Sequence, residues 1–316
     1  MSILLKEFER KESAPAAVPD GVAKPGWLKV RLPAHPHFFQ LRDLLQGYKL
    51  NTICQSARCP NMADCWSART ATFLLLGKTC TRRCAFCAVA KGKPEPPSPD
   101  EPQRVADAVA ALDLDYAVLT SVTRDDLADG GAGHFAATVR AIKARSPGIK
   151  VEVLIPDLRG NKKALRTVIE SGPDVLNHNL ETTESCYPLI NRPVEHYRRS
   201  LDLLTEASLM GSTTKSGLMV GLGEDEAQLL RTMEDLVKAG CRLLTIGQYL
   251  RPSKNHVPVR KYYHPDEFDR FSKIGMELGF RLVEAGPLVR SSYRAARMYD
   301  TLARDQAEQD AVSGLR

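Results

Sequence analysis

The sequence predicts an α/β protein built as a partial, open (β/α) barrel of six units, similar to a TIM barrel, with extensions at both ends. Strand-length apolar runs alternate six times with amphipathic segments, which is typical of a parallel sheet. A complete barrel would need two more units. The motif G-x-G-x-x-G, which is typical of doubly wound sheets that bind dinucleotides, does not follow the first apolar run. A doubly wound sheet is therefore the less favoured alternative. The predicted strands are residues 71–76, 116–121, 150–155, 174–180, 216–221 and 242–249.

An amphipathic segment follows each predicted strand, and several carry helix start and stop signals. Asn161 can cap one helix, which would end at Gly172-Pro173, and the acidic run 224–226 opens another that ends at Gly240. The predicted helices are residues 102–112, 133–145, 161–171, 195–210, 225–239 and 266–279. In such barrels the chemistry lies on loops that follow the strands, so we expect the site there.

The first 50 residues are rich in proline, which prevents long helices. A short helix is predicted near residues 38–45, where four apolar side chains share a face. We expect residues 1–20 to form a tail and the chain from about residue 25, where Trp27 and Leu28 occur, to lie on the body. The predicted division is an N-terminal extension 1–70, a barrel 71–280 and a C-terminal extension 281–316.

The composition is that of a globular protein, with 43% hydrophobic and 26% charged residues in a chain of 316. No apolar run is long enough to span a membrane, and three acids among the first twelve residues argue against an export signal, so we expect a cytoplasmic protein. The net charge is 44 − 38 = +6, without a Lys/Arg block. This disfavours nucleic acid as a partner and suits a weak encounter with an acidic protein.

Six of the eight cysteines lie between residues 54 and 87, and the later three have the spacing C-x3-C-x2-C. We call Cys80, Cys84 and Cys87 the second triplet. Three thiolates on a short loop can hold three irons of a [4Fe–4S] cluster and leave the fourth iron open, and Phe86 can shield such a cluster from water. A zinc site or a redox C-x-x-C pair is the alternative. Zinc would need a fourth ligand, and a redox pair would leave Cys80 unexplained.

The earlier cysteines, Cys54, Cys59 and Cys65, form a first triplet with the spacing C-x4-C-x5-C. Three thiolates again leave a metal site one ligand short. The alternatives are a structural zinc or a cluster closed by Cys186 or Cys241. Both of these lone cysteines more readily fit the role of small buried side chains.

The second triplet, placed directly after the first predicted strand, resembles the signature of the radical S-adenosylmethionine superfamily. The two triplets together resemble the lipoyl synthase family, and the resemblance covers most of the chain outside the first 25 and the last 15 or so residues. Further matching stretches are TSVTRDDL, HNLET, KSGLMVGLGE, QYLRPS and RSSY at residues 120–127, 178–182, 215–224, 248–253 and 290–293.

The resemblance implies a radical enzyme with two [4Fe–4S] clusters and S-adenosylmethionine. The second triplet would hold the cluster whose open iron chelates this cofactor, and one electron would cleave it to a 5′-deoxyadenosyl radical. The first triplet would hold an auxiliary cluster with Ser292 as fourth ligand, and that cluster would supply sulfur. An oxygen ligand suits iron–sulfur clusters poorly, so its bond should open easily. From the residues alone, a helix cap is the favoured role of RSSY, and only the resemblance makes Ser292 a ligand.

The same resemblance implies insertion of sulfur at C6 and C8 of an octanoyl chain that is amide-linked to a lysine. The substrate would be an octanoylated lipoyl carrier domain or H-protein. A low-potential electron donor of the ferredoxin or flavodoxin type and an iron–sulfur carrier would be further partners. The other readings of the sequence are a biotin-synthase-like sulfurtransferase and a non-enzymatic iron–sulfur electron carrier.

Residues after the predicted strands are candidates for binding S-adenosylmethionine. Polar groups after the second strand could meet its methionine end, Asn179 and Glu181 could bind its ribose, and glycines of the fifth strand, Gly217 and Gly221 among them, allow close approach. The alternative role for each is a turn or a bend. The candidates are Phe86, Thr120, Ser121, Thr123, Asn179, Glu181, Gly221 and Tyr249.

Overall fold

The main sheet of this protein is an open barrel wall. The structure, a computed structural model, describes residues 17–19, 23–30, 32–67 and 70–313. The eight strands lie in the order of the chain: β1 (Asn51–Thr52), β2 (Thr72–Leu75), β5 (Tyr116–Ser121), β6 (Lys150–Leu154), β7 (Val175–Asn177), β8 (Thr214–Val220), β9 (Leu243–Gln248) and β10 (Leu282–Gly286). Only β1 pairs in antiparallel fashion with its neighbour.

This strand order confirms the partial barrel and excludes the doubly wound alternative, because the order never reverses. All six predicted strands are present, although β7 ends three residues early. There the chain leaves the strand, and Glu181 adopts a positive φ of 76°. The sheet also contains β10, a seventh parallel strand that the sequence analysis missed. Along β10 only Val283 is buried, so buried and exposed residues do not alternate. The strand therefore lacks the alternation of apolar and polar residues that marks a strand in a sequence.

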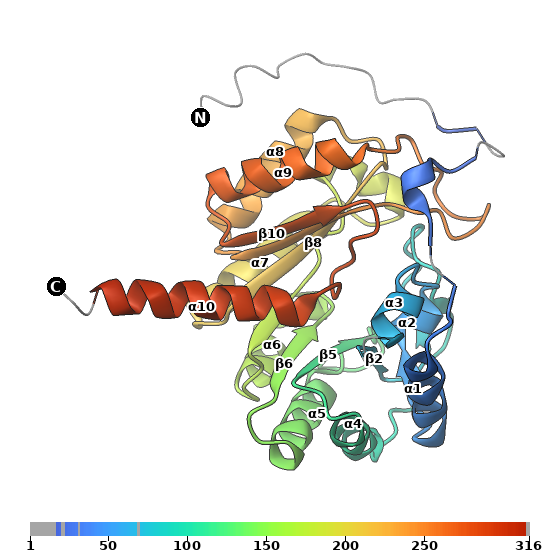
Figure 1. The fold of residues 1–316 in the computed structure, drawn as a ribbon, viewed down its shortest axis with the longest axis vertical. Coiled ribbons are helices and arrows are strands. Elements are labelled where there is room, and N and C mark those ends of the chain that lie inside the picture. The colour runs from blue at the N-terminus through green and yellow to red at the C-terminus, as the bar shows by residue number, and fades with distance from the viewer. Residues whose placement is uncertain (1–16, 20–22, 31, 68–69, 314–316) are drawn as a thin grey trace.

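The six predicted helices are present and lie around the outside of the sheet (Figure 1). They are α4 (Glu101–Ala111), α5 (Ala132–Arg145), α6 (Lys162–Ile169), α7 (Glu195–Leu209), α8 (Glu226–Lys238) and α9 (Pro265–Leu278). As predicted, the Asn161 side chain accepts a hydrogen bond from the Ala164 N–H at the start of α6. Asp225 and Gln228 form a capping box at α8.

The two faces of the sheet differ in character. Side chains alternate between faces along a strand, and paired residues of parallel strands share a face. The outer face is apolar and packs on the helices, with Leu119, Val151 and Val153 in the largest core cluster. The inner face carries polar groups, among them a buried ion pair in which Lys215 Nζ lies 3.0 Å from Glu152 Oε1.

The N-terminal extension contains α1 (Pro36–Gly47), α2 (Ile53–Ser56) and α3 (Met62–Ser67). The predicted short helix is thus confirmed, and it begins earlier because Pro36 is tolerated at a first helical position. The Val18 N–H donates to the Val259 carbonyl, and Leu28 is buried, so the described part of the arm lies on the body. Most of the predicted tail, residues 1–16 and 20, lies outside the described residues.

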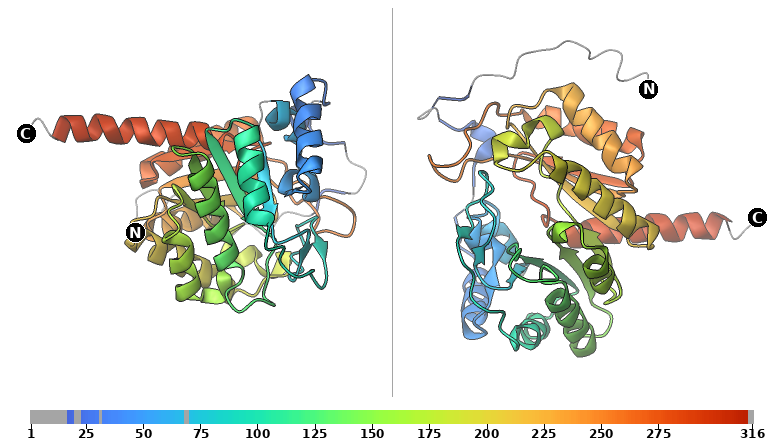
Figure 2. Two further views of the ribbon diagram at one scale, coloured as in Figure 1. Left: turned by 90° about the horizontal axis from the view of Figure 1, so that it is seen from below. Right: turned by 180° about the vertical axis from the view of Figure 1, so that it is seen from behind.

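The C-terminal helix α10 (Ala295–Ser313) begins against the inner side of the sheet. Its Met298 packs with Val175 and Leu243 near the starts of β7 and β9. Figure 2 shows α1 and the far end of α10 on opposite sides of the barrel. In the described part of the chain, none of the helices is both long and apolar enough to cross a bilayer.

Candidate functional site

The second triplet lies on a loop that begins directly after β2, as predicted. Two short parallel strands, β3 (Thr79–Cys80) and β4 (Ala90–Lys91), bracket this loop. Ala85 ties it to two other loops: its N–H donates to the Ile190 carbonyl at 2.9 Å, and its carbonyl accepts from the Val257 N–H at 3.1 Å. Backbone contacts from two distant segments therefore fix the place of the three thiols.

Arg82, inside the second triplet, anchors the loop to the barrel through two carboxylates. Its guanidinium donates to both oxygens of Asp125 at 2.7 and 2.9 Å and to Asp157 Oδ1 at 2.6 Å. Asp157 is buried and also lies 3.4 Å from Arg199 Nη1. Burial acts to raise the pKa of Asp157, but the hydrogen bond and charge of Arg82 hold it well below its usual range.

Arg192 is a residue that the sequence analysis missed, because no motif marks it. Its Nε donates to Cys84 Sγ at 3.4 Å, its Nη2 lies 3.7 Å from Glu181 Oε1, and its guanidinium stands 5.5 Å from the centre of the Phe86 ring. Burial raises the pKa of Glu181, and the charge of Arg192 opposes that shift. A cationic side chain is thus held against the sulfur of one cysteine of the triplet.

The first triplet surrounds the opposite end of β2. Cys54 lies on α2, the Cys59 N–H donates to the Cys54 carbonyl at 2.9 Å, and Cys65 lies on α3. Burial raises the pKa of the Cys54 and Cys59 thiols. It raises that of Cys65 to about 12, and the charges of the other two thiolates contribute. Metal binding at these buried thiols must therefore release protons.

Thr72, the first residue of β2, links the first triplet to the C-terminal extension. Its N–H hydrogen-bonds the Cys54 thiol, and its Oγ1 donates to Ser292 Oγ at 2.8 Å. Arg290 lies close enough to Cys59 for its charge to lower the thiol's pKa. The tertiary structure therefore brings the RSSY stretch to the first triplet, across 220 residues of chain.

The helix-cap reading of RSSY is not what these contacts show. Ser292 Oγ accepts from Thr72, Ser291 Oγ donates to Asn179 Oδ1 at 2.7 Å, and α10 begins only at Ala295. Both hydroxyls thus engage other elements of the barrel. Ser292 contributes to the helix start through its carbonyl, which accepts from the Ala295 N–H.

The two lone cysteines lie in other parts of the core. Cys241 packs in the cluster around α8 and α9, and its thiol donates to the Leu243 carbonyl at 3.3 Å. Cys186 packs with Tyr249 and Val259, whereas Cys54 belongs to the cluster around β2. The structure therefore does not bring either of them to the first triplet as a fourth ligand.

The donor set fits iron–sulfur clusters. All eight cysteines are free thiols, and in each triplet the charges of the thiolates influence one another. Among the described residues, no three His, Cys, Asp or Glu side chains converge on one metal ion. The ligands of a [4Fe–4S] cluster bind separate irons, so they need not converge in this way.

The predicted cofactor residues near β5 lie at its carboxyl end. Thr120 is buried, and its hydroxyl donates to the Leu154 carbonyl at 2.9 Å. The Ser121 hydroxyl is a buried atom with no hydrogen-bond partner. The Thr123 carbonyl accepts from both the N–H and the hydroxyl of Thr81 in the second triplet's loop. Of these three residues, Ser121 has a buried hydroxyl that could serve a ligand, whereas the Thr120 hydroxyl is already engaged by the Leu154 carbonyl.

Three further candidates for cofactor binding, Phe86, Tyr249 and Gly221, make contacts within the protein that explain their presence. Phe86 packs in the same cluster as Tyr249, whose hydroxyl donates to the Val257 carbonyl at 2.8 Å. Gly221 has a φ of 99°, and a Cβ there would lie 2.4 Å from the Lys261 carbonyl oxygen. The positive φ and this close approach both require glycine here, and the approaching atoms belong to the protein itself.

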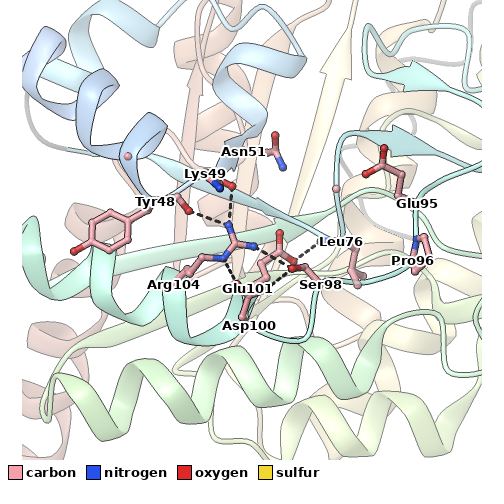
Figure 3. A pocket seen from close by; sticks show the side chains of 12 residues that line it. Tyr48, Lys49, Asn51, Leu76, Glu95, Pro96, Ser98, Asp100, Glu101 and Arg104 are labelled. Carbon is pink, nitrogen blue, oxygen red and sulfur yellow. Dashed lines mark hydrogen bonds and ion pairs between the residues drawn. The ribbon is translucent and has the colours of Figure 1, made fainter.

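A separate cavity of about 580 Å³ lies outside both triplets, between α1, β2 and α4 (Figure 3). Arg104 spans it, donating to the Tyr48 and Lys49 carbonyls at 2.9 Å and to Ser98 Oγ at 3.2 Å. Arg104 therefore ties the end of α1 to α4, which steadies the extension that carries the first triplet.

We predict that Asp157→Ala lowers stability at neutral pH by about 3 kcal/mol, because it removes the buried carboxylate that pairs with the half-buried Arg82. A melting temperature about 5–10 °C lower is expected. The folded-state pKa of Asp157 is depressed, so its stabilisation is present above the unfolded pKa of about 4 and is lost as pH falls below it.

The measurement is anaerobic thermal unfolding at pH 7 and at lower pH, with Asp43→Ala as control. Asp43 pairs with Arg42 on the surface, where both side chains are well exposed. Its loss should change stability by well under 1 kcal/mol. Equal effects of the two substitutions would contradict the anchoring role of Asp157.

Comparison with known proteins identifies the family of this chain. The radical SAM superfamily profile matches residues 74–236, which include the second triplet. Lipoyl synthase from Rubrobacter xylanophilus is 53% identical over 274 residues, covering 86% of this chain and 85% of that protein. Lipoyl synthase from Nitratidesulfovibrio vulgaris is 52% identical over 278 residues, covering 88% and 93%.

Solved structures agree at the level of the fold. The FeFe-hydrogenase maturase HydG from Carboxydothermus hydrogenoformans superposes with a TM-score of 0.52 at 14% identity, covering 85% of this chain and 78% of that one. Streptococcus suis SuiB bound to S-adenosylmethionine gives 0.52 at 10% identity, covering 68% and 49%. The superfamily match accounts for one iron–sulfur cluster and S-adenosylmethionine as cofactors. The long match to its relatives shows that this chain belongs to the lipoyl synthases, radical SAM enzymes.

Proposed function

We propose that this protein inserts two sulfur atoms, at C6 and C8, into an octanoyl chain carried on a lysine of a lipoyl carrier domain or H-protein. The second triplet would hold the cluster that binds S-adenosylmethionine, and the first triplet with Ser292 would hold an auxiliary cluster. The observation that carries the proposal is the Thr72 contact pair, with Cys54 on one side and Ser292 on the other.

The separation of the two triplets supports a division of labour between them. Thr72 begins β2 beside the first triplet, and the second triplet follows the other end of that strand. The strand's four residues span about 13 Å at roughly 3.3 Å each. Two clusters at its ends would thus be near neighbours without sharing ligands.

The protein's own groups would hold and orient the bound cofactors. When bound, the clusters and S-adenosylmethionine supply the electron, the radical and the sulfur. Cys80, Cys84 and Cys87 would bind three irons and leave the fourth open, and Arg192 would orient the Cys84 sulfur through its hydrogen bond. Ser121, with its unpaired buried hydroxyl at the end of β5, would be a donor toward S-adenosylmethionine.

The positive net charge supports an acidic partner surface, since complementary charge speeds encounter between proteins. We propose a cytoplasmic location, a low-potential ferredoxin or flavodoxin as electron donor, and an iron–sulfur carrier that rebuilds the auxiliary cluster. These partners follow from the chemistry, which consumes one electron per cofactor cleaved and removes sulfur from the protein.

The test is product analysis after anaerobic reconstitution with iron and sulfide. With S-adenosylmethionine, reductant and an octanoyl-lysine peptide, mass spectrometry should detect a peptide that has gained two sulfurs, together with 5′-deoxyadenosine. An electron carrier would yield neither product. Formation of 5′-deoxyadenosine without sulfur gain on any octanoylated substrate would contradict the proposed reaction.

Substitutions of Ser292 should separate a ligand from a structural hydroxyl. Ser292→Cys should retain the auxiliary cluster and slow sulfur insertion, because thiolate binds iron more strongly and the corner opens less readily. Ser292→Ala should make the cluster easier to lose, so iron per chain should fall from about eight toward four. Iron content and sulfur-insertion yield should be measured anaerobically for both variants.

A purely structural hydroxyl predicts a different result. Loss of the Thr72 hydrogen bond alone would cost about 1 kcal/mol of stability. Iron content and product yield would then equal those of the parent protein in both variants, and Ser292 would no longer be a candidate ligand.

A further inference from the structure

The chain after β10 crosses the inner face of the barrel before it reaches the first triplet. We call residues 287–292 the crossing segment. It turns back from β10 where the Val289 N–H donates to the Gly286 carbonyl at 3.1 Å. It then passes over β9 and β8, and Ser292 meets Thr72 on β2, toward the other edge of the sheet.

Contacts along its course hold this segment. The Asn61 side chain of the N-terminal extension donates to the Leu288 carbonyl at 2.6 Å. Ser291 Oγ donates to Asn179 Oδ1, just beyond β7. Arg290 lies near Cys59, and its guanidinium donates to the Val289 carbonyl at 2.6 Å. The segment therefore depends on contacts with both the barrel and the first triplet.

Two glycines on the inner face lie directly beneath the crossing segment. A Cβ built on Gly247 in β9 would stand 2.1 Å from the Val289 carbonyl oxygen. One built on Gly217 in β8 would stand 2.6 Å from Asn179 Oδ1 and 2.9 Å from Ser291 Oγ. Carbon and oxygen atoms do not approach so closely, so any side chain at either position would displace the segment or its partners.

Backbone conformation does not account for these glycines. Neither has a positive φ, and both lie in regular parallel pairing, Gly217 with Thr245 and Gly247 with Met219. Every L-residue can adopt such a conformation, and glycine weakens a strand interior. What the two positions have in common is the close approach of the segment that ends at Ser292.

We infer that Gly217 and Gly247 are positioning residues that seat the crossing segment on the inner face and so place Ser292 at the first triplet. This inference rests on the proposed role of Ser292 as the fourth ligand. A methyl group on Gly247 meets backbone atoms, so the segment itself must move by roughly 1 Å, and a misplacement of that size can cost about 100-fold in rate. A methyl group on Gly217 meets three side-chain oxygens, those of Asn179, Ser291 and Thr245, which can rotate away.

The experiment compares Gly247→Ala, Gly217→Ala and Gly47→Ala in the full chain after anaerobic reconstitution. Gly47 lies in α1, and a Cβ there would meet no heavy atom within 4 Å, so it is the matched control. The readouts are hydrogen exchange of residues 287–292, iron per chain and sulfur-insertion yield. We expect the largest effects for Gly247→Ala, smaller ones for Gly217→Ala, and parent values for the control.

For Gly247→Ala, exchange in the crossing segment should rise, iron should fall toward four per chain, and the yield should drop about 100-fold. Parent-like exchange and iron in Gly247→Ala would overturn the inference. Faster exchange with full iron content and yield would overturn it as well, because the seating would then not place Ser292. If Gly247→Ala does not fold, Gly217→Ala provides the test. Its effects on exchange, iron content and yield must then exceed those of the Gly47→Ala control, and equal effects would overturn the inference.

Ser292→Ala separates this inference from the proposed function. If that variant retains iron and yield, Ser292 is not a ligand and the proposed function fails at that point. The exchange of residues 287–292 in the glycine variants then still reports whether the glycines seat the segment, since that readout needs no cluster ligand.

Discussion

Replacement of Cys84 by alanine should abolish cleavage of S-adenosylmethionine, the largest effect that we expect from any single substitution. Two thiolates cannot hold a [4Fe–4S] cluster that already has one corner open to the cofactor. Cys84 is also the buried member of its triplet, and Arg192 would be left beside a missing thiolate. The measurement is anaerobic formation of 5′-deoxyadenosine with reductant present, which should fall to background.

Cys241→Ala is the matched control for this loss. Cys241 is equally buried but packs in the core around α8 and α9, away from both triplets. This variant should cleave S-adenosylmethionine at the parent rate, with at most a modest loss of stability. Cleavage at the parent rate by Cys84→Ala would show that the second triplet does not bind the cofactor's cluster.

Replacement of Cys59 by alanine should stop sulfur insertion and leave cleavage of S-adenosylmethionine partly intact. Cys59 belongs to the first triplet and lies near Arg290 of the crossing segment, so its loss disrupts only that end of β2. The second triplet is held by its own anchors, Ala85 and Arg82, which do not involve the first. Iron content should fall from about eight to about four per chain.

The two activities must be measured on the same preparation of the variant. Product analysis gives sulfur insertion, 5′-deoxyadenosine gives cleavage, and the cluster spectrum shows whether the second cluster is present. If a folded Cys59→Ala variant with an intact second cluster loses both activities, the division of labour between the triplets is wrong. If it still inserts two sulfurs, the first triplet is not the sulfur source.

The sequence alone was sufficient for features that depend on short stretches of chain. The second triplet spans eight residues and the first spans twelve, so their spacing restricts which groups can share a site. The six strand–helix units were also predictable, because each is a local pattern of apolar residues with its own start and stop signals, such as Asn161 at α6. The strand β10 was missed because its half-exposed residues carry no such pattern.

Only the tertiary structure decided which distant groups meet. Ser292 and Thr72 are 220 residues apart, and Arg192 and Cys84 are 108 apart, yet each pair is in contact. The resemblance to a family suggested Ser292, but no local signal marked Arg192, Asp157 or Gly247. Such contacts arise when the sheet curves into an open barrel and its inner face becomes a shared surface for strands, loops and the crossing segment. Short-range sequence patterns do not encode that curvature, because it depends on the packing of the whole chain.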